Sequence, residues 1–203
     1  MVINWTKTFE NKRFIILGGR PGIGKTNISL QLANSLPHDG EITLLNFNHT
    51  TNIVNIGKQI PINIVNFHIK PNQKELTETL YFASKKGNCF IIDTLQDLTD
   101  DTTENNAYSL VKALKKFAKE NNCTFVITSN LSRNIENRRC HIPEVKDLQE
   151  KYNHICIFDC IGLIYRESYY DPLGDRRTQI FFKDAHNKNL FVLTAENLQT
   201  YSK

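Results

Sequence analysis

Short apolar runs alternate with amphipathic stretches along the chain. Residues 89–92 are apolar throughout, which is typical of a strand that is buried on both faces of a parallel sheet. Similar runs of apolar and β-branched residues predict further strands at intervals along the sequence. The predicted strands cover residues 14–17, 42–47, 62–69, 89–92, 125–128, 160–165, 179–183 and 190–194.

The stretches between these runs carry apolar residues at helical spacing. Ile28, Leu32 and Leu36 recur in this way within residues 25–36, and residues 104–121 have the clearest apolar stripe. Gly87 is expected to end the helix before it as a C-terminal cap. The predicted helices cover residues 25–36, 73–86, 104–121 and 144–154, and the polar segment 129–143 is expected to be a loop.

The order of these elements predicts a fold class. Strands and helices alternate first, and the turn residues at 171–174 and 187–189 then favour antiparallel hairpins. Alternating βα units that finish in hairpins indicate one α/β domain with a mixed, mostly parallel sheet and flanking helices. A length of 203 residues fits a single domain over residues 1–203.

Composition narrows the location and the partners. No apolar run approaches the ~20 residues of a membrane span, so no membrane partner is expected. The N-terminal residues have no long apolar centre, which favours the cytoplasm over secretion. Five cysteines without a Cys-x-x-Cys pair fit reduced thiols. A net charge of +4 permits a polyanionic partner without demanding one.

A phosphate-binding loop is the strongest chemical signal. The pattern G-x-x-x-x-G-K-[ST] lies between a predicted strand and a predicted helix, which is the context that it requires. Backbone N–H groups of such a loop surround phosphate oxygens, the lysine reaches the β- and γ-phosphates, and the hydroxyl coordinates Mg²⁺. The loop consists of Gly19, Arg20, Pro21, Gly22, Ile23, Gly24, Lys25 and Thr26. We expect this chain to bind ATP with Mg²⁺.

A second magnesium-binding group follows the apolar strand at 89–92. Asp93 stands at the end of that strand, where an acid that holds the Mg²⁺ shell is expected beside Thr26. The predicted strand at 42–47 lies between Lys25 and Asp93 in the chain, and this insertion favours the RecA-like branch of phosphate-loop folds over nucleotide kinases.

Four further segments point to one family. Residues 90–96, 129–133, 147–148 and 163–167 follow one another in an order that resembles the RecA-like motor domain of DnaB-type replicative DNA helicases. The resemblance is densest over residues 89–170. It implies ATP-driven movement on single-stranded DNA during replication. The implied partners are identical subunits, which form a ring and hold nucleotide between them, or other replication proteins. The family's N-terminal domain and linker helix have no counterpart among these residues.

Three positions depart from the pattern that the resemblance implies. Asn48 stands where the family has the glutamate that activates water, and an amide cannot accept the proton. Lys183 matches the first residue of the family's Lys-x-Arg pair, which reaches the neighbouring subunit's γ-phosphate, but Ala185 replaces the arginine. Asn130 replaces the glutamine that senses the γ-phosphate. Since an arginine finger contributes about 10³-fold or more to turnover, slow hydrolysis is expected.

The resemblance also implies a DNA-contacting loop after the Asp147-Leu148 pair. Its residues here are Gln149, Glu150 and Lys151, where the family has Arg, Glu and a small residue. Arg138 and Arg139 offer further phosphate contacts, although solvated loop charges are an equally good interpretation. The sequence shows no basic stripe interleaved with aromatic residues, which is typical of single-strand stacking surfaces.

Two interpretations follow for the activity. The first is a DNA-dependent ATPase with Lys25, Asp93, Asn48, Asn130 and Lys183 at the reaction centre. The second is a helicase relative that binds nucleotide without hydrolysing it and regulates assembly. A small-molecule kinase is a weaker third alternative, because no arginine-rich lid is evident.

Overall fold

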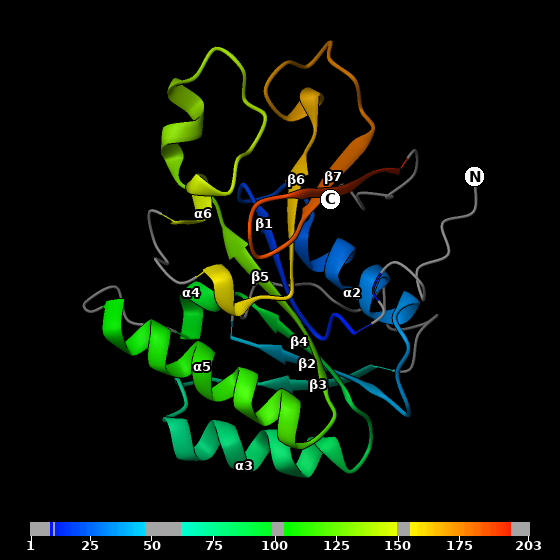
Figure 1. Ribbon diagram of the computed structural model, residues 1–203, viewed down its shortest axis with the longest axis vertical. Helices are drawn as coiled ribbons and strands as arrows, with labels where there is room; N and C mark the ends of the chain where they lie inside the picture. Colours follow the sequence, from blue (N-terminus) through cyan, green and yellow to red (C-terminus); the bar gives the residue numbers. More distant parts are fainter. Residues whose placement is uncertain (1–8, 10, 48–61, 99–103, 150–154, 196–203) are drawn as a thin grey trace.

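The computed structural model describes residues 9, 11–47, 62–98, 104–149 and 155–195. An eight-stranded sheet forms its centre, in the order β3-β2-β4-β5-β1-β6-β7-β8 (Figure 1). The strands are β1 (Phe14–Gly19), β2 (Ile42–Asn46), β3 (Ile62–Asn66), β4 (Cys89–Asp93), β5 (Thr124–Asn130), β6 (Cys160–Tyr165), β7 (Thr178–Lys183) and β8 (Asn189–Ala195).

The pairing confirms the predicted mixed, mostly parallel sheet. β1 to β6 pair in parallel, and β7 and β8 are antiparallel additions. β5 lies between β1 and β4, so the strand before the phosphate loop and the strand that ends at Asp93 are separated by one strand. The region 42–47, which favoured a RecA-like arrangement, forms β2 on the far side of β4.

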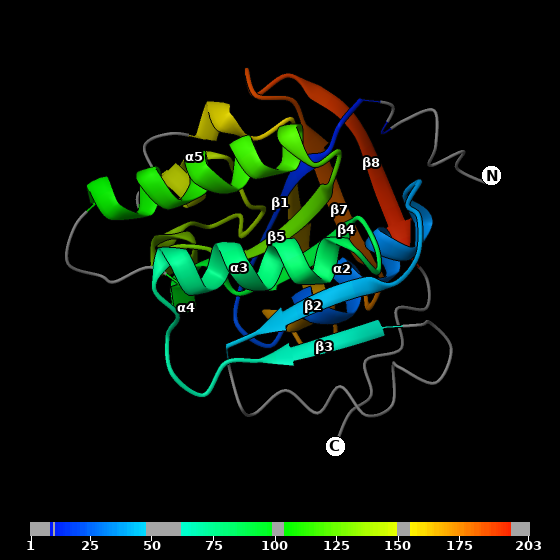
Figure 2. The same cartoon turned by 90° about the horizontal axis from the view of Figure 1, so that it is seen from below.

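Helices cover both faces of the sheet, which explains why its central strands are apolar on both sides. Helix α2 (Lys25–Ser35) packs on one face, and α3 (Gln73–Ser84) and α5 (Glu104–Glu120) pack on the other (Figures 1 and 2). All six residues of β1 are buried, and the side chains of its first four residues alternate between the two cores. The phosphate loop therefore starts from a strand that is fixed on both sides.

Helix α3 begins at a capping box and ends earlier than predicted. The Asn72 side chain accepts hydrogen bonds from the backbone of Lys74 and Glu75, and the Glu75 side chain accepts one from the Asn72 backbone. The prediction that Gly87 is the C-terminal cap was wrong, because the helix already ends at Ser84 with Lys85 as its cap residue, and the φ of Gly87 is not positive. A Cβ at Gly87 would lie 1.9 Å from the Glu41 carbonyl oxygen, so a close backbone approach requires this glycine.

Two other predictions of local structure need correction, and one helix was missed. Residues 129–143 are not entirely a loop: β5 continues through Asn130, and a 3₁₀ helix, η2, spans Arg133–Asn137. The helix predicted over 144–154 is present only as α6 (Lys146–Gln149), with 150–154 outside the described residues. Helix α4 (Leu95–Leu98) was not predicted. Within the described residues, no helix has the length and hydropathy needed to cross a bilayer.

Candidate nucleotide and nucleic-acid site

Strand register brings the predicted phosphate-binding residues to one edge of the sheet. Gly19 at the end of β1 pairs with Asn130 at the end of β5. Asp93 ends β4 and pairs with Asn46 of β2. Because these strands are parallel, their carboxyl ends meet at the edge where ligands of open α/β sheets bind.

The loop after β1 has the backbone of an anion-binding turn. Gly22 and Gly24 have φ values of 77° and 104°, a region that residues other than glycine rarely adopt. Helix α2 begins at Lys25, immediately after Gly24. The positive end of the helix dipole therefore faces the loop, which suits a phosphate group.

Lys25 is held inside this loop. Its Nζ donates hydrogen bonds to the carbonyl oxygens of Gly19 (3.2 Å) and Arg20 (3.3 Å), and to Oδ1 of Asn130 at 2.7 Å. Burial lowers the pKa of Lys25 to about 8, and the negative charge of Asp93 partly opposes this shift. The lysine and the predicted γ-phosphate sensor are thus in direct contact.

Thr26 and Asp93 are also in contact. The Thr26 hydroxyl donates a hydrogen bond to Oδ2 of Asp93 at 2.5 Å, and the hydroxyl of Thr128 donates to Oδ1 at 2.5 Å. Asp93 is buried, with 6% of its surface exposed. A hydroxyl beside a carboxylate is an oxygen donor set of the kind that Mg²⁺ prefers, so these residues fit the predicted metal.

Side chains from the β6–β7 connection hold the outer side of the phosphate loop. Arg166 donates a hydrogen bond through its guanidinium to the Ile23 carbonyl at 3.0 Å, and the Tyr169 hydroxyl donates to the Pro21 carbonyl at 2.9 Å. These bonds engage backbone carbonyl oxygens of the loop. The sequence pattern gave no indication of these contacts, because more than 140 residues separate each pair.

Asn130 is held from two sides. Its Oδ1 accepts the Lys25 bond, and its backbone N–H donates to Oε1 of Gln96 at 3.1 Å. Gln96 also donates through Nε2 to the Ser129 hydroxyl at 2.9 Å. Helix α4, which carries Gln96, therefore positions the end of β5 beside the phosphate loop.

Two predicted catalytic residues are not part of this cluster in the described residues. Asn48 lies outside the part of the chain that the structure describes, two positions after β2 ends beside Asp93. Lys183 pairs with Ile161 of β6, which lies level with Ile16, three residues before Gly19. Its Nζ donates to Oδ1 of Asn187 at 2.9 Å. A reach from Lys183 to a neighbouring subunit stays a prediction.

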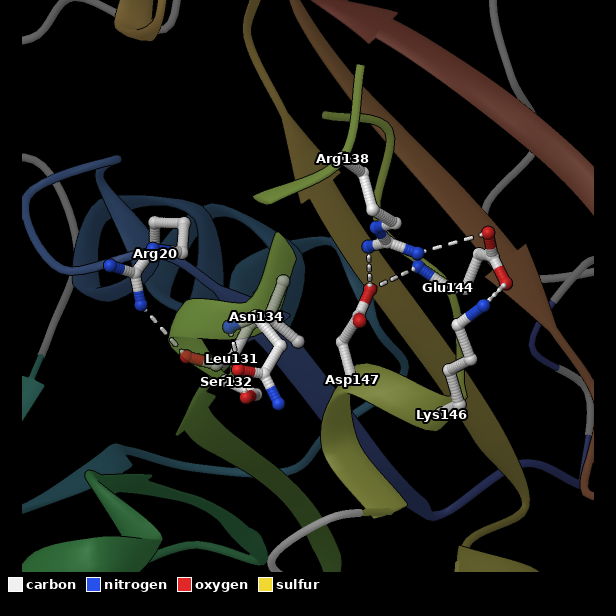
Figure 3. A network of polar contacts seen from close by, with 8 residues as sticks. All are labelled: Arg20, Leu131, Ser132, Asn134, Arg138, Glu144, Lys146 and Asp147. Carbon is white, nitrogen blue, oxygen red and sulfur yellow. Dashed lines mark hydrogen bonds and ion pairs between the residues drawn. The ribbon is translucent and has the colours of Figure 1, made fainter. Parts of the chain in front are cut away.

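The predicted nucleic-acid residues differ in how they are held. The Arg138 guanidinium bonds to Asp147 at 2.6 Å and to Glu144 at 3.0 Å, and Asp147 also accepts a bond from the Glu144 backbone at 2.7 Å (Figure 3). A DNA phosphate would have to compete with these carboxylates for Arg138.

The remaining nucleic-acid candidates lie at or beyond the ends of this network. Arg139 is exposed, and it borders a cavity of about 500 Å³ whose wall includes the stacked rings of His141 and Tyr170. Gln149 is the last residue of α6, while Glu150 and Lys151 lie outside the described residues. DNA contacts by these residues stay predictions.

Arg20 belongs to the loop motif, but its side chain turns away from the lysine. Its guanidinium donates to the Leu131 carbonyl at 2.9 Å (Figure 3) and forms an ion pair with Glu136 of η2. The hydrogen bond between Arg20 and Lys25 is made by the backbone carbonyl of Arg20, and the positive charge of its side chain contributes to the lowered pKa of Lys25. A nucleotide contact of Arg20 stays a prediction.

Comparison with known proteins places these features in a family. The family model described as DnaB-like helicase C terminal domain matches residues 38–194, a range that begins after the phosphate loop. A probable replicative DNA helicase of Trieres chinensis is 23% identical over 86% of this chain and 48% of its own length. The replicative DNA helicase DnaB of Rickettsia bellii (strain RML369-C) is 26% identical over 80% of this chain and 43% of its own.

Solved structures share the fold. The ATPase domain of G40P superposes with a TM-score of 0.74 at 20% identity, over 94% of this chain and 84% of that chain. A DnaB-like replicative helicase, solved in a study of its interactions with primase, gives a TM-score of 0.70 at 20% identity, over 96% and 58%. The chain spans about half the length of the curated relatives it matches. The fold is RecA-like, and the chain belongs to the family of DnaB-like helicase C-terminal domains.

Proposed function

We propose that this chain binds ATP with Mg²⁺ at the phosphate loop and couples nucleotide to single-stranded DNA, as a motor domain of a replicative helicase. The observation that carries the proposal is the direct contact of Lys25 with Asn130 and of Thr26 with Asp93. Two groups for the phosphates and two for the metal thus lie together at one sheet edge. Membership of the DnaB-like family supports the same activity.

The residues of this edge would divide the work between them. The loop amides and the Lys25 ammonium would bind and orient the phosphates, since charge-assisted hydrogen bonds are the strong ones. Thr26 and Asp93 would hold Mg²⁺, which neutralises phosphate charge when it is bound. Asn130 would orient the terminal phosphate through its amide. Asn48 would orient water, because an amide cannot act as a general base.

Asn48 and Ala185 support a second candidate function. Without the glutamate and the arginine finger, the domain would bind nucleotide with slow or no hydrolysis and act as a regulatory module. The two functions make opposite predictions for turnover. We propose in both cases that subunits assemble with the nucleotide between them, and that Lys183 acts on the neighbour's site or that other replication proteins complete it.

ATP turnover with and without single-stranded DNA, beside a nucleotide-binding titration, tests the proposal and separates the two functions. A DNA-stimulated ATPase supports the motor, and binding without turnover supports the regulatory module. In the second case, we expect Asn48→Glu to raise turnover, since a positioned base is worth about 10²- to 10⁴-fold. Ala185→Arg should be added to it, because both groups act on one transition state. A chain that binds no ATP contradicts both.

A further inference from the structure

We propose that Arg20 and Glu136 are a positioning pair that links the phosphate loop to residues 131–149, the segment that leads into the predicted DNA-contacting loop. Through this pair, nucleotide occupancy sets the position of that segment. The inference rests on the proposed function, because it names the residues by which nucleotide and DNA binding affect each other.

The Arg20 side chain is oriented toward the segment that follows β5. Its residue surface is only 7% exposed, and its guanidinium contacts the Leu131 carbonyl and the Glu136 carboxylate. The Leu131 backbone N–H donates in return to the Gly19 carbonyl at 3.3 Å. Two consecutive loop residues are therefore bonded to the one segment that follows β5. A guanidinium in this orientation contributes to the position of the loop and not to phosphate binding.

A bound phosphate would compete with protein groups for the Lys25 ammonium. The Lys25 ammonium bonds to the carbonyls of Gly19 and Arg20 and to Asn130, the residue before Leu131. A phosphate is a stronger acceptor than an amide or carbonyl oxygen, because it is charged. A phosphate in the loop would therefore compete for the Lys25 ammonium with the Gly19 and Arg20 carbonyls and with Asn130, which all adjoin Leu131. The Arg20 side chain would keep the phosphate loop and the segment that begins at Leu131 together during this change.

Asp147 connects the segment after β5 to the helix that precedes the predicted DNA contacts. The Ser132 backbone N–H donates to the Asp147 carbonyl at 3.1 Å, and Arg138 bonds to the Asp147 carboxylate (Figure 3). Asp147 is 2% exposed, and it lies in α6, which ends at Gln149. A displacement at Leu131 and Ser132 thus reaches the helix that precedes Glu150 and Lys151.

Glu136 is the half of the pair that can be changed safely. Its side chain is 47% exposed, against 8% for Arg20, so glutamine there remains in contact with solvent. Glu144→Gln is a matched control. It also removes a carboxylate that pairs with an arginine of this segment, and the Glu144 side chain is 54% exposed. Among the described residues, Glu144 does not contact the phosphate loop.

The test is backbone hydrogen exchange with and without Mg²⁺-ATP in the parent, Glu136→Gln and Glu144→Gln. In the parent and in Glu144→Gln, ATP should change the exchange of both the phosphate loop and residues 131–149. In Glu136→Gln, the change at the phosphate loop should persist, with ATP affinity within about threefold of the parent. The change over 131–149 should be lost, and Glu136→Asp should restore most of it.

Single-stranded DNA affinity with and without Mg²⁺-ATP is the second readout. ATP should shift the parent's affinity by about 5- to 150-fold, and Glu136→Gln should bring this ratio close to one. An unchanged exchange pattern in Glu136→Gln overturns the inference, as does an equal loss in Glu144→Gln or a parent response confined to the phosphate loop. A parent that binds ATP but no DNA contradicts the proposed function instead, and the exchange experiment then still decides the inference.

Discussion

At the scale of single residues, the ionisation of Lys25 connects burial to ligand binding. Desolvation lowers its pKa to about 8, although three oxygen acceptors surround the ammonium. The groups around it thus compensate only part of the lost hydration. A bound triphosphate would bring several negative charges to the same place, so we expect it to raise the pKa of Lys25 again.

This change in pKa predicts proton uptake on nucleotide binding. At pH 8 about half of the Lys25 side chains are neutral in the free protein, so Lys25 should take up about half a proton per site when ATP binds. At pH 7 the uptake should fall to about one tenth. Calorimetric titration with ATP in buffers of different ionisation enthalpy measures this number directly.

Lys25→Arg is the control for proton uptake, because arginine keeps its charge throughout this pH range. The uptake at pH 8 should disappear in this variant if ATP still binds. An uptake that is the same in Lys25→Arg as in the parent would assign the proton to another group and contradict the role of burial.

The Tyr169 hydroxyl provides a second test at this scale. Tyr169→Phe removes the hydrogen bond to the Pro21 carbonyl and little else, so it should weaken ATP binding by about 2- to 10-fold, the equivalent of about 0.5–1.5 kcal/mol. Tyr81→Phe on α3 is the matched control, since Tyr81 is 53% exposed. An equal ATP affinity in parent and Tyr169→Phe would show that the loop orders without this contact.

At the scale of elements, α3 depends on its first turn. Asn72→Ala removes the acceptor of both capping hydrogen bonds and should lower the free energy of unfolding by about 1 kcal/mol. Lys74→Ala, which removes only an exposed pair with Glu78, should change it by less than about 0.5 kcal/mol. Urea denaturation of the two variants measures both effects, and equal values would contradict the role of the cap.

The elements also show which features sequence can predict. The strands of the sheet and the phosphate loop were predicted because their signals are local: an apolar run for β4, and glycines at fixed spacing for the loop. Gly87 was misinterpreted because glycine is required there by a close approach to the Glu41 backbone, which belongs to another part of the chain. Its partner could not be inferred from periodicity.

The same distinction applies to the site. Lys25, Thr26 and Asp93 could be predicted because a motif and a strand end define them, and the structure brings them together. The contacts of Arg166, Tyr169 and Glu136 depend on how β6, η2 and the loop meet in three dimensions. No spacing within one sequence encodes these pairings.

At the scale of the whole molecule, Lys183 distinguishes a subunit that acts alone from an assembly. The β-sheet register places it level with Ile16, below the edge that carries the phosphate loop. We therefore expect Lys183→Ala to weaken ATP binding only at protein concentrations where subunits associate. Nucleotide titrations across a dilution series, with sedimentation to record assembly, measure this. The same loss in a dilute monomer would contradict a role across subunits.

Binding of Mg²⁺-ATP to the parent and to Lys25→Ala tests the central claim most directly. Calorimetric titration of the parent should give saturable binding with one nucleotide per chain. Lys25→Ala should keep the parent's circular dichroism spectrum and lose at least about tenfold in affinity, because a buried charge-assisted contact worth about 1.5–3 kcal/mol is removed. Equal affinities in the two proteins, or a parent that binds no ATP, would contradict the assignment of this loop as the nucleotide site.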